Sequence, residues 1–119
     1  MEIKYKINIA KDFSAYPAGR FRTEGDASGE AFLLDHLLGK LIAAIIEECV
    51  LEIDLNDMNG YPSSFISGSF GKITYELGKV MGQKKASKLI KKHLSLKCED
   101  SAARAKAIED EIDNPISKK

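Results

Sequence analysis

Residues 50–77 read VLEIDLNDMNGYPSSFISGSFGKITYEL, and they predict a strand, a loop and a helix in succession. Residues 49–55 are a short apolar run typical of a buried strand, and the polar loop 56–62 follows with a Gly and a Pro. Beyond the loop, the apolar residues recur at steps of four and three, the period of a helix with one buried face. They are Ile66, Phe70, Ile73, Leu77 and Val80. We expect any functional site at the start of this helix.

Ser63 and Ser64 open the predicted helix. Serine hydroxyls at a helix start can accept hydrogen bonds from free backbone N–H groups. The positive end of the helix dipole also favours an anion there, including a phosphate on either serine. Helix capping alone, a phosphorylation switch and contact with a ligand are therefore all open. A nucleophilic Ser63 would need a base and an oxyanion hole, and the sequence places no histidine for that role, so we predict that the protein is not an enzyme.

The composition of the chain limits its class. Its 119 residues suffice for one domain, and 18 basic residues balance 18 acidic ones. A neutral chain is not built as a general binder of nucleic acid or anionic membranes. The longest apolar run, residues 41–46, is too short to span a bilayer, and the first residues lack a secretory signal. Cys49 and Cys98 have no metal-ligand spacing, so we expect reduced thiols, no metal, no cofactor and a cytoplasmic location.

Other elements follow from the same periodicities. Alternation predicts a strand at 3–9, a second short strand at 19–23 pairing with it, and a further strand at 94–98. Helical patterns span 28–48, 84–93 and 102–112. Gly68 and Gly71 inside the central helix should mark a close approach of its backbone to another backbone or a partner. The broad apolar stripe of helix 28–48 should pack on the sheet; it comprises Leu34, Leu37, Leu38, Leu41, Ile42 and Ile45.

This order of elements predicts a single α/β domain over residues 1–113, followed by a polar tail at 114–119. Strands alternating with helices favour a sheet with helices packed on it. We expect about four strands in a mixed sheet.

Several motifs resemble one protein family. Asp54-Leu55 followed by Ser63-Ser64 resembles the pattern of the STAS domain, the fold of sulfate transporters and anti-sigma-factor antagonists. A branch of STAS-like domains of unknown function, found in bacterial and phage genomes, is similar in further segments. These are Gly19-Arg20-Phe21-Arg22, Gly25, Ser28-Gly29-Glu30-Ala31-Phe32, and Ser63-Ser64-Phe65 followed by a helix containing Gly71. The resemblance covers residues 3–112. Pro62 stands where the wider family has an Asp, and Phe65 where it has a Gly.

The resemblance implies a STAS-like sandwich and a regulatory protein-binding module. STAS antagonists bind a GHKL-type (histidine-kinase-like) ATPase, are phosphorylated on the first serine of the loop, and then lose affinity for that partner. By position, this serine is Ser63, with Ser64 beside it. The implied contact surface comprises Arg20, Arg22, Asp57, Tyr61, Pro62, Ser63, Ser64 and Phe65. Simple exposure on a strand is the alternative for the two arginines, whose forked donors suit carboxylate or phosphate.

Two other functions stay open. The same helix start could serve a small-molecule or nucleotide sensor as an anion site. A cluster of basic residues could contact nucleic acid, although a solvated helix face is favoured because aromatic stacking residues are absent. The cluster is Lys84, Lys85, Lys88, Lys91, Lys92 and His93.

Overall fold

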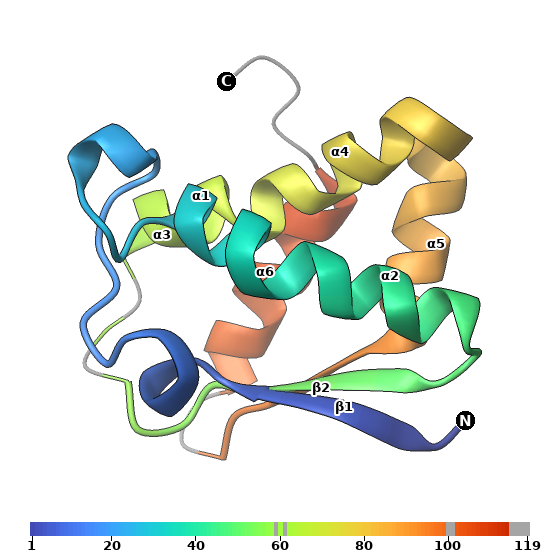
Figure 1. Ribbon diagram of the computed structural model, residues 1–119, viewed down its shortest axis with the longest axis horizontal. Coiled ribbons are helices and arrows are strands. Elements are labelled where there is room, and N and C mark those ends of the chain that lie inside the picture. The colour runs from blue at the N-terminus through green and yellow to red at the C-terminus, as the bar shows by residue number, and fades with distance from the viewer. Residues whose placement is uncertain (59, 61, 100–101, 115–119) are drawn as a thin grey trace.

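The computed structural model describes residues 1–58, 60, 62–99 and 102–114. Its sheet has three parallel strands in the order β1 (Ile3–Asn8), β2 (Val50–Asp54) and β3 (Leu94–Lys97). Because strand order follows chain order, right-handed crossovers bring both connections to the same side of the sheet. Figure 1 shows the helices on that one side, with the sheet at the bottom of the view.

The helical layer has two parts, one from each crossover. The first is a nearly continuous rod made of α1 (Gly29–Phe32), the π-helical turn η3 (Leu33–Leu37) and α2 (Leu38–Ile46). The second consists of α3 (Ser63–Gly68), α4 (Phe70–Met81) and α5 (Gln83–His93). After β3, helix α6 (Ala102–Asp113) packs mainly on α4. Two short turns, η1 (Ile9–Phe13) and η2 (Arg22–Glu24), lie between β1 and α1.

The two faces of the sheet differ in polarity. Leu51 and Ile53 of β2 are fully buried under the helices, together with Ile7 of β1. Side chains alternate along a strand, so the neighbours of these residues lie on the opposite face. The strand register aligns Lys6 with Glu52 and Ser95 there, and Asn8 with Asp54 and Lys97. One apolar core therefore lies between sheet and helices, and it extends from Ile7 to Ile112.

The predicted α/β class is confirmed, but the four-stranded mixed sheet is wrong. Residues 19–23 form a bend and the start of η2, and no strand, in the described chain. Their backbone N–H groups bind carboxylates in place of β1: those of Arg20 and Phe21 donate to Glu24, and that of Arg22 to Glu30. The expected strands at 3–9, 49–55 and 94–98 and all four expected helical regions are present. None of the described helices is long and apolar enough to cross a membrane.

Two details of the predicted helices are wrong. The helix from Ser63 is interrupted at Ser69, where φ is −107° and ψ is −81°. The Ser69 hydroxyl donates a 2.8 Å hydrogen bond to the Phe65 carbonyl, which provides a local partner at the break. Val80 was expected in the buried stripe but is 85% exposed, and Leu34 on the earlier helix is 49% exposed. Each stripe is wider than the face that the fold buries.

Candidate protein-binding site

The first turn of α3 presents the two serines. Pro62 occupies the N-cap position, and its carbonyl accepts hydrogen bonds from the N–H groups of Phe65 and Ile66. Among the described residues, no side chain caps this helix, so capping, one of the three roles left open for Ser63 and Ser64, is not observed. Ser63 is exposed, Ser64 is half-buried, and neither hydroxyl has a hydrogen-bond partner among the described residues. Both hydroxyls are therefore available to a modifying enzyme or a partner.

Three segments distant in sequence meet at α3. A Cβ atom on Gly29 would lie 2.4 Å from the Phe65 carbonyl oxygen and 2.8 Å from the Cα of Gly68. A Cβ atom on Gly68 would lie 2.6 Å from the carbonyl oxygen of Arg20. Side chains do not tolerate such distances to backbone, so only glycine fits at both positions. The predicted close approach at Gly68 is thus confirmed, and it joins the segments 19–22, 28–32 and 63–68.

Backbone hydrogen bonds fasten the loop 19–24 to the start of α1. The N–H of Gly29 donates to the carbonyl of Gly19 at 2.9 Å, and the N–H of Glu30 to that of Arg20 at 2.9 Å. Glu24 accepts from two backbone N–H groups, first that of Phe21 and then that of Arg20, and these bonds lower the pKa of its carboxyl group. The loop is therefore held in one conformation beside α3.

The two arginines differ in their partners. The guanidinium of Arg22 forms an ion pair with Asp35 of η3. The side chain of Arg20 packs at Gly68, since its Cγ would lie 3.1 Å from a Cβ there. The Nε atom of Arg20 is buried and has no hydrogen-bond partner in the described part of the chain. A buried donor without a partner is costly. The guanidinium as a whole is half-buried and its charge, after the backbone hydrogen bonds, helps to lower the pKa of Glu24, so any contact with an outside anion would be made by its terminal nitrogens.

The remaining expected contact residues differ in their exposure to solvent. Phe65 is fully buried against the rings of Phe13 and Phe32, so its assignment to the contact surface is wrong. Burial of a large aromatic ring in the core is favourable, which explains why the Phe65 side chain points inward. Pro62 and Asp57 are exposed, Asp57 with φ of 68° in the loop after β2. Tyr61 lies outside the described residues.

The motif residues of the two loops lie at one end of the sheet. Figure 1 shows α3 and the loop before α1 at the same end of the molecule, beyond the carboxyl ends of β1 and β2. The loops that leave these two parallel, neighbouring strands therefore come together there. We call Pro62, Ser63, Ser64 and the segment Gly19–Arg22 the motif surface.

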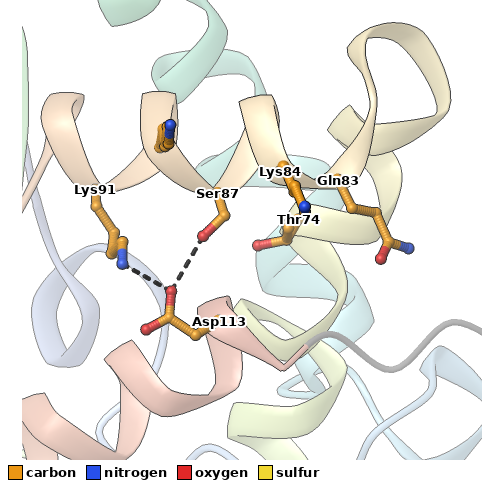
Figure 2. A pocket seen from close by; sticks show the side chains of 7 residues that line it. Thr74, Gln83, Lys84, Ser87, Lys91 and Asp113 are labelled. Atoms are coloured by element: carbon orange, nitrogen blue, oxygen red, sulfur yellow. Dashed lines mark hydrogen bonds and ion pairs between the residues drawn. The ribbon is translucent and has the colours of Figure 1, made fainter.

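A second candidate lies elsewhere, between α4, α5 and the end of α6 (Figure 2). It is an open pocket of about 340 Å³. Asp113 projects into it, accepts hydrogen bonds from Ser87 and Lys91, and has a lowered pKa chiefly because of Lys91. Its lining residues are Thr74, Gln83, Lys84, Ser87, Lys88, Lys91 and Asp113.

Sequence analysis singled out three lysines of this pocket as part of a basic cluster, but not Thr74, Gln83 or Asp113. These come from other turns and elements, and no spacing in the sequence connects them. His93, assigned to the same cluster, is buried instead, with its Nδ1 2.8 Å from the Cys49 carbonyl oxygen. Among the described residues, no group of three His, Cys, Asp or Glu side chains could hold a metal ion.

Comparison of the chain with models of known protein families, with curated proteins and with solved structures gives no significant match. The relation to STAS-like domains therefore stays a prediction from the motif residues.

Proposed function

We propose that this chain is a non-enzymatic regulatory module of the cytoplasm that binds a GHKL-type ATPase through the motif surface. One observation carries the proposal: the three segments that resemble STAS-like domains pack together at Gly29 and Gly68, beside two free serine hydroxyls. A glycine at each contact is required by the backbone approach, so the sequence is specialised for bringing these segments together.

Phosphorylation of the first turn of α3 controls this binding in the proposal. A phosphate adds about −1.5 to −2 charges at pH 7. Arg20 packs one helical turn from Ser64, at Gly68; its charge acts on the nearby carboxylate of Glu24, but its Nε has no hydrogen-bond partner in the described chain. A phosphate on Ser63 or Ser64 would compete with a partner's carboxylate for this guanidinium. The modified surface would then repel the acidic partner that the unmodified surface accepts.

The two histidines have other contacts than the serines in the described part of the chain. The ring of His93 is held by the Cys49 carbonyl, and the ring of His36 packs against Phe13 and Phe32. No described hydrogen bond joins either histidine to Ser63 or Ser64. A hydrolase using these serines would need such a base.

The test is an affinity capture from the native host with ATP present, combined with intact-mass analysis of the recovered bait. We expect a co-purifying GHKL-type ATPase and one added phosphate that maps to Ser63 or Ser64. Alanine at both serines should abolish the phosphate and retain the ATPase, whereas Ser63→Asp should reduce its recovery at least tenfold. Ala107→Asp on the exposed side of α6 adds the same charge elsewhere and serves as the matched control.

Two results would contradict the proposal. Recovery of no ATPase by the unmodified chain would remove the proposed partner. Equal loss of the ATPase in Ser63→Asp and Ala107→Asp would show a general charge effect with no specific role for the motif surface.

The basic pocket in Figure 2 favours a second candidate function, binding of a small anionic molecule such as a nucleotide. Asp113 neutralises only one of its three lysines, Lys91, so Lys84 and Lys88 remain to attract an anion. Thermal denaturation with millimolar ATP tests it, because a ligand that binds the folded state raises the melting temperature. An increase that disappears in the variant with both Lys84→Ala and Lys88→Ala, and persists in Lys106→Ala, would support this function.

A further inference from the structure

Helix α2 is apolar on two opposite sides. Its inward residues Leu41 and Ala44, and Leu37 at the end of η3 before it, have no exposed surface. Its outward side carries Ile42, 37% exposed, and Ile46, 75% exposed. A helix that is hydrophobic all round is normally buried all round. The outward side of α2 therefore has the composition of an interface.

The apolar surface continues onto the end of α4. Val80 is 85% exposed, and a groove of about 220 Å³ separates it from α2. We call this groove, with Leu34 on η3, the apolar face; the groove is lined by Ile42, Ile45, Ile46, Leu77, Val80 and Met81. Its exposed side chains amount to an area on the order of 400 Å², a size that on a monomer usually marks an interaction site.

Gly39 is a second and independent sign that a backbone approaches this face. A glycine inside a helix costs roughly 0.5–1 kcal/mol relative to alanine. Gly29 and Gly68 have a reason within the chain, but a Cβ on Gly39 would meet no atom within 4 Å. Gly39 is exposed and precedes Ile42 by three residues and Ile46 by seven, so all three lie on one side of α2. The open space over Gly39 would admit a second helix closely.

The side chains that line the groove carry no charge. Several charges near it are paired within the chain: Asp35 with Arg22, Glu76 with Lys79 at 3.2 Å, and Glu47 with Lys4 at 2.6 Å. Lys40 lies about 160° around the helix axis from Ile42, and Glu48 follows Ile46 by two residues, so both charges lie at the border of the face. An uncharged groove matches a partner face that is likewise apolar. A chain with a net charge of zero also exerts little long-range repulsion on its own copies.

We propose that the apolar face joins two copies of this chain in a symmetric dimer. The two α2 helices cross antiparallel near Gly39, which brings Ile46 of each copy toward Leu34 of the other, because these residues lie on either side of Gly39. A two-fold interface uses the same patch on both copies, and this face offers both protruding side chains and a groove. The groove lies between the ends of α2 and α4, away from α3 (Figure 1), whereas Leu34 at the other end of the face adjoins Asp35, which pairs with Arg22 of the motif surface.

The exposed apolar area of the face fits a weak dimer. Stable interfaces bury about 800 Å² per partner, roughly twice this area, and smaller interfaces are typical of transient complexes. We therefore expect a dissociation constant in the micromolar range or weaker.

Sedimentation velocity of the full chain between 1 and roughly 300 µM tests the proposal, since this range spans a micromolar dissociation constant. The unmodified chain should shift from monomer to dimer. Gly39→Gln should raise the dissociation constant at least tenfold without lowering the melting temperature of the monomer, because the new side chain meets no atom of its own chain. Ile46→Glu should weaken the dimer similarly, because its side chain is already exposed in the monomer.

Ala107→Glu, on the exposed side of α6, is the matched control and should dimerise as the unmodified chain does. If the chain stays monomeric up to the highest concentration, the dimer proposal is overturned, even if the apolar face binds another protein. A dimer that tolerates both Gly39→Gln and Ile46→Glu overturns it too, because the copies then associate through another surface.

Discussion

Two glycines in the first crossover have opposite surroundings. Gly29 begins α1 against the backbone of Phe65 and Gly68, whereas Gly39 faces open space in α2. The same chemical change at the two positions should therefore have opposite effects. This contrast tests whether the contact between α1 and α3 is as rigid as the backbone distances indicate.

Gly29→Ala should lower the free energy of unfolding by about 1–3 kcal/mol, because a methyl group in a packed site forces the backbones apart. Gly39→Ala should raise it by about 0.5–1 kcal/mol, because alanine loses less chain entropy in a helix. Urea denaturation at low micromolar protein concentration measures both. A neutral Gly29→Ala variant would mean that α3 can move away from α1, and the motif surface would then lack a fixed geometry.

Single residues also mark the limit of what the sequence predicts about the site. Gly68 was expected to allow a close approach, but its partner, the carbonyl of Arg20, lies 48 positions earlier in the chain. Periodicity contains no information on which distant segment comes near. Phe65 was expected at the surface from its neighbours in the motif, yet its ring is buried because aromatic area is the strongest local driving force for burial.

Among the elements, periodicity predicted which segments are helices or strands and where they begin. It failed at 19–23, where the carboxylates of Glu24 and Glu30 take the backbone N–H groups that a strand would use. It also failed to separate the two apolar sides of α2, because a wide stripe does not state which part faces the sheet. Tertiary contacts decide which side of α2 faces the sheet, whereas the hydrogen bonds at 19–23 join residues three, four and eight positions apart, which periodicity does not register.

Helix α6 is attached to α4 by one buried hydrogen bond that can be removed. The Thr74 hydroxyl, 1% exposed, donates to the Ile112 carbonyl at 2.8 Å. Thr74→Val keeps the shape but leaves this carbonyl unsatisfied, so we expect a loss of about 1–2 kcal/mol. Hydrogen exchange should become faster in α6 than in α4. Ser87→Ala, which removes an exposed bond to Asp113, is the control and should change stability by less than about 0.5 kcal/mol.

If Thr74→Val accelerated exchange equally in all helices, α6 would unfold only together with the rest of the chain. In that case, the four side-chain bonds to its last turns, two of which are made by Asp113, would not define a separate unit.

For the molecule as a whole, three carboxylates that hold parts of the chain in place have a lowered pKa. Glu24 is held by backbone N–H groups of its own loop before α1, and its ordinary pKa is 4.5. Glu47 at the end of α2 is hydrogen-bonded first by Lys4 and then by Tyr5 of β1, and its ordinary pKa is also 4.5. Asp113 is held by Lys91 of α5, and its ordinary pKa is 3.8. Glu47 and Asp113 thus join β1 and α6 to other helices, whereas Glu24 closes its own loop.

A folded-state pKa below the ordinary value means that the unfolded chain binds protons more readily in acid. The stabilisation from these carboxylates is therefore complete above pH 4.5 and is lost as the pH falls through their folded values. Chemical denaturation between pH 3 and 7 should show a constant free energy of unfolding down to about pH 5 and a decrease below it. Glu24→Gln should make this decrease shallower, because an amide does not titrate. Since all three groups are largely exposed, their effect at neutral pH should be small and should weaken with salt. If the free energy of unfolding decreased below pH 5 in Glu24→Gln as it does in the unmodified chain, this carboxylate would be equally protonated in the folded and unfolded chains. Other groups would then cause the acid sensitivity.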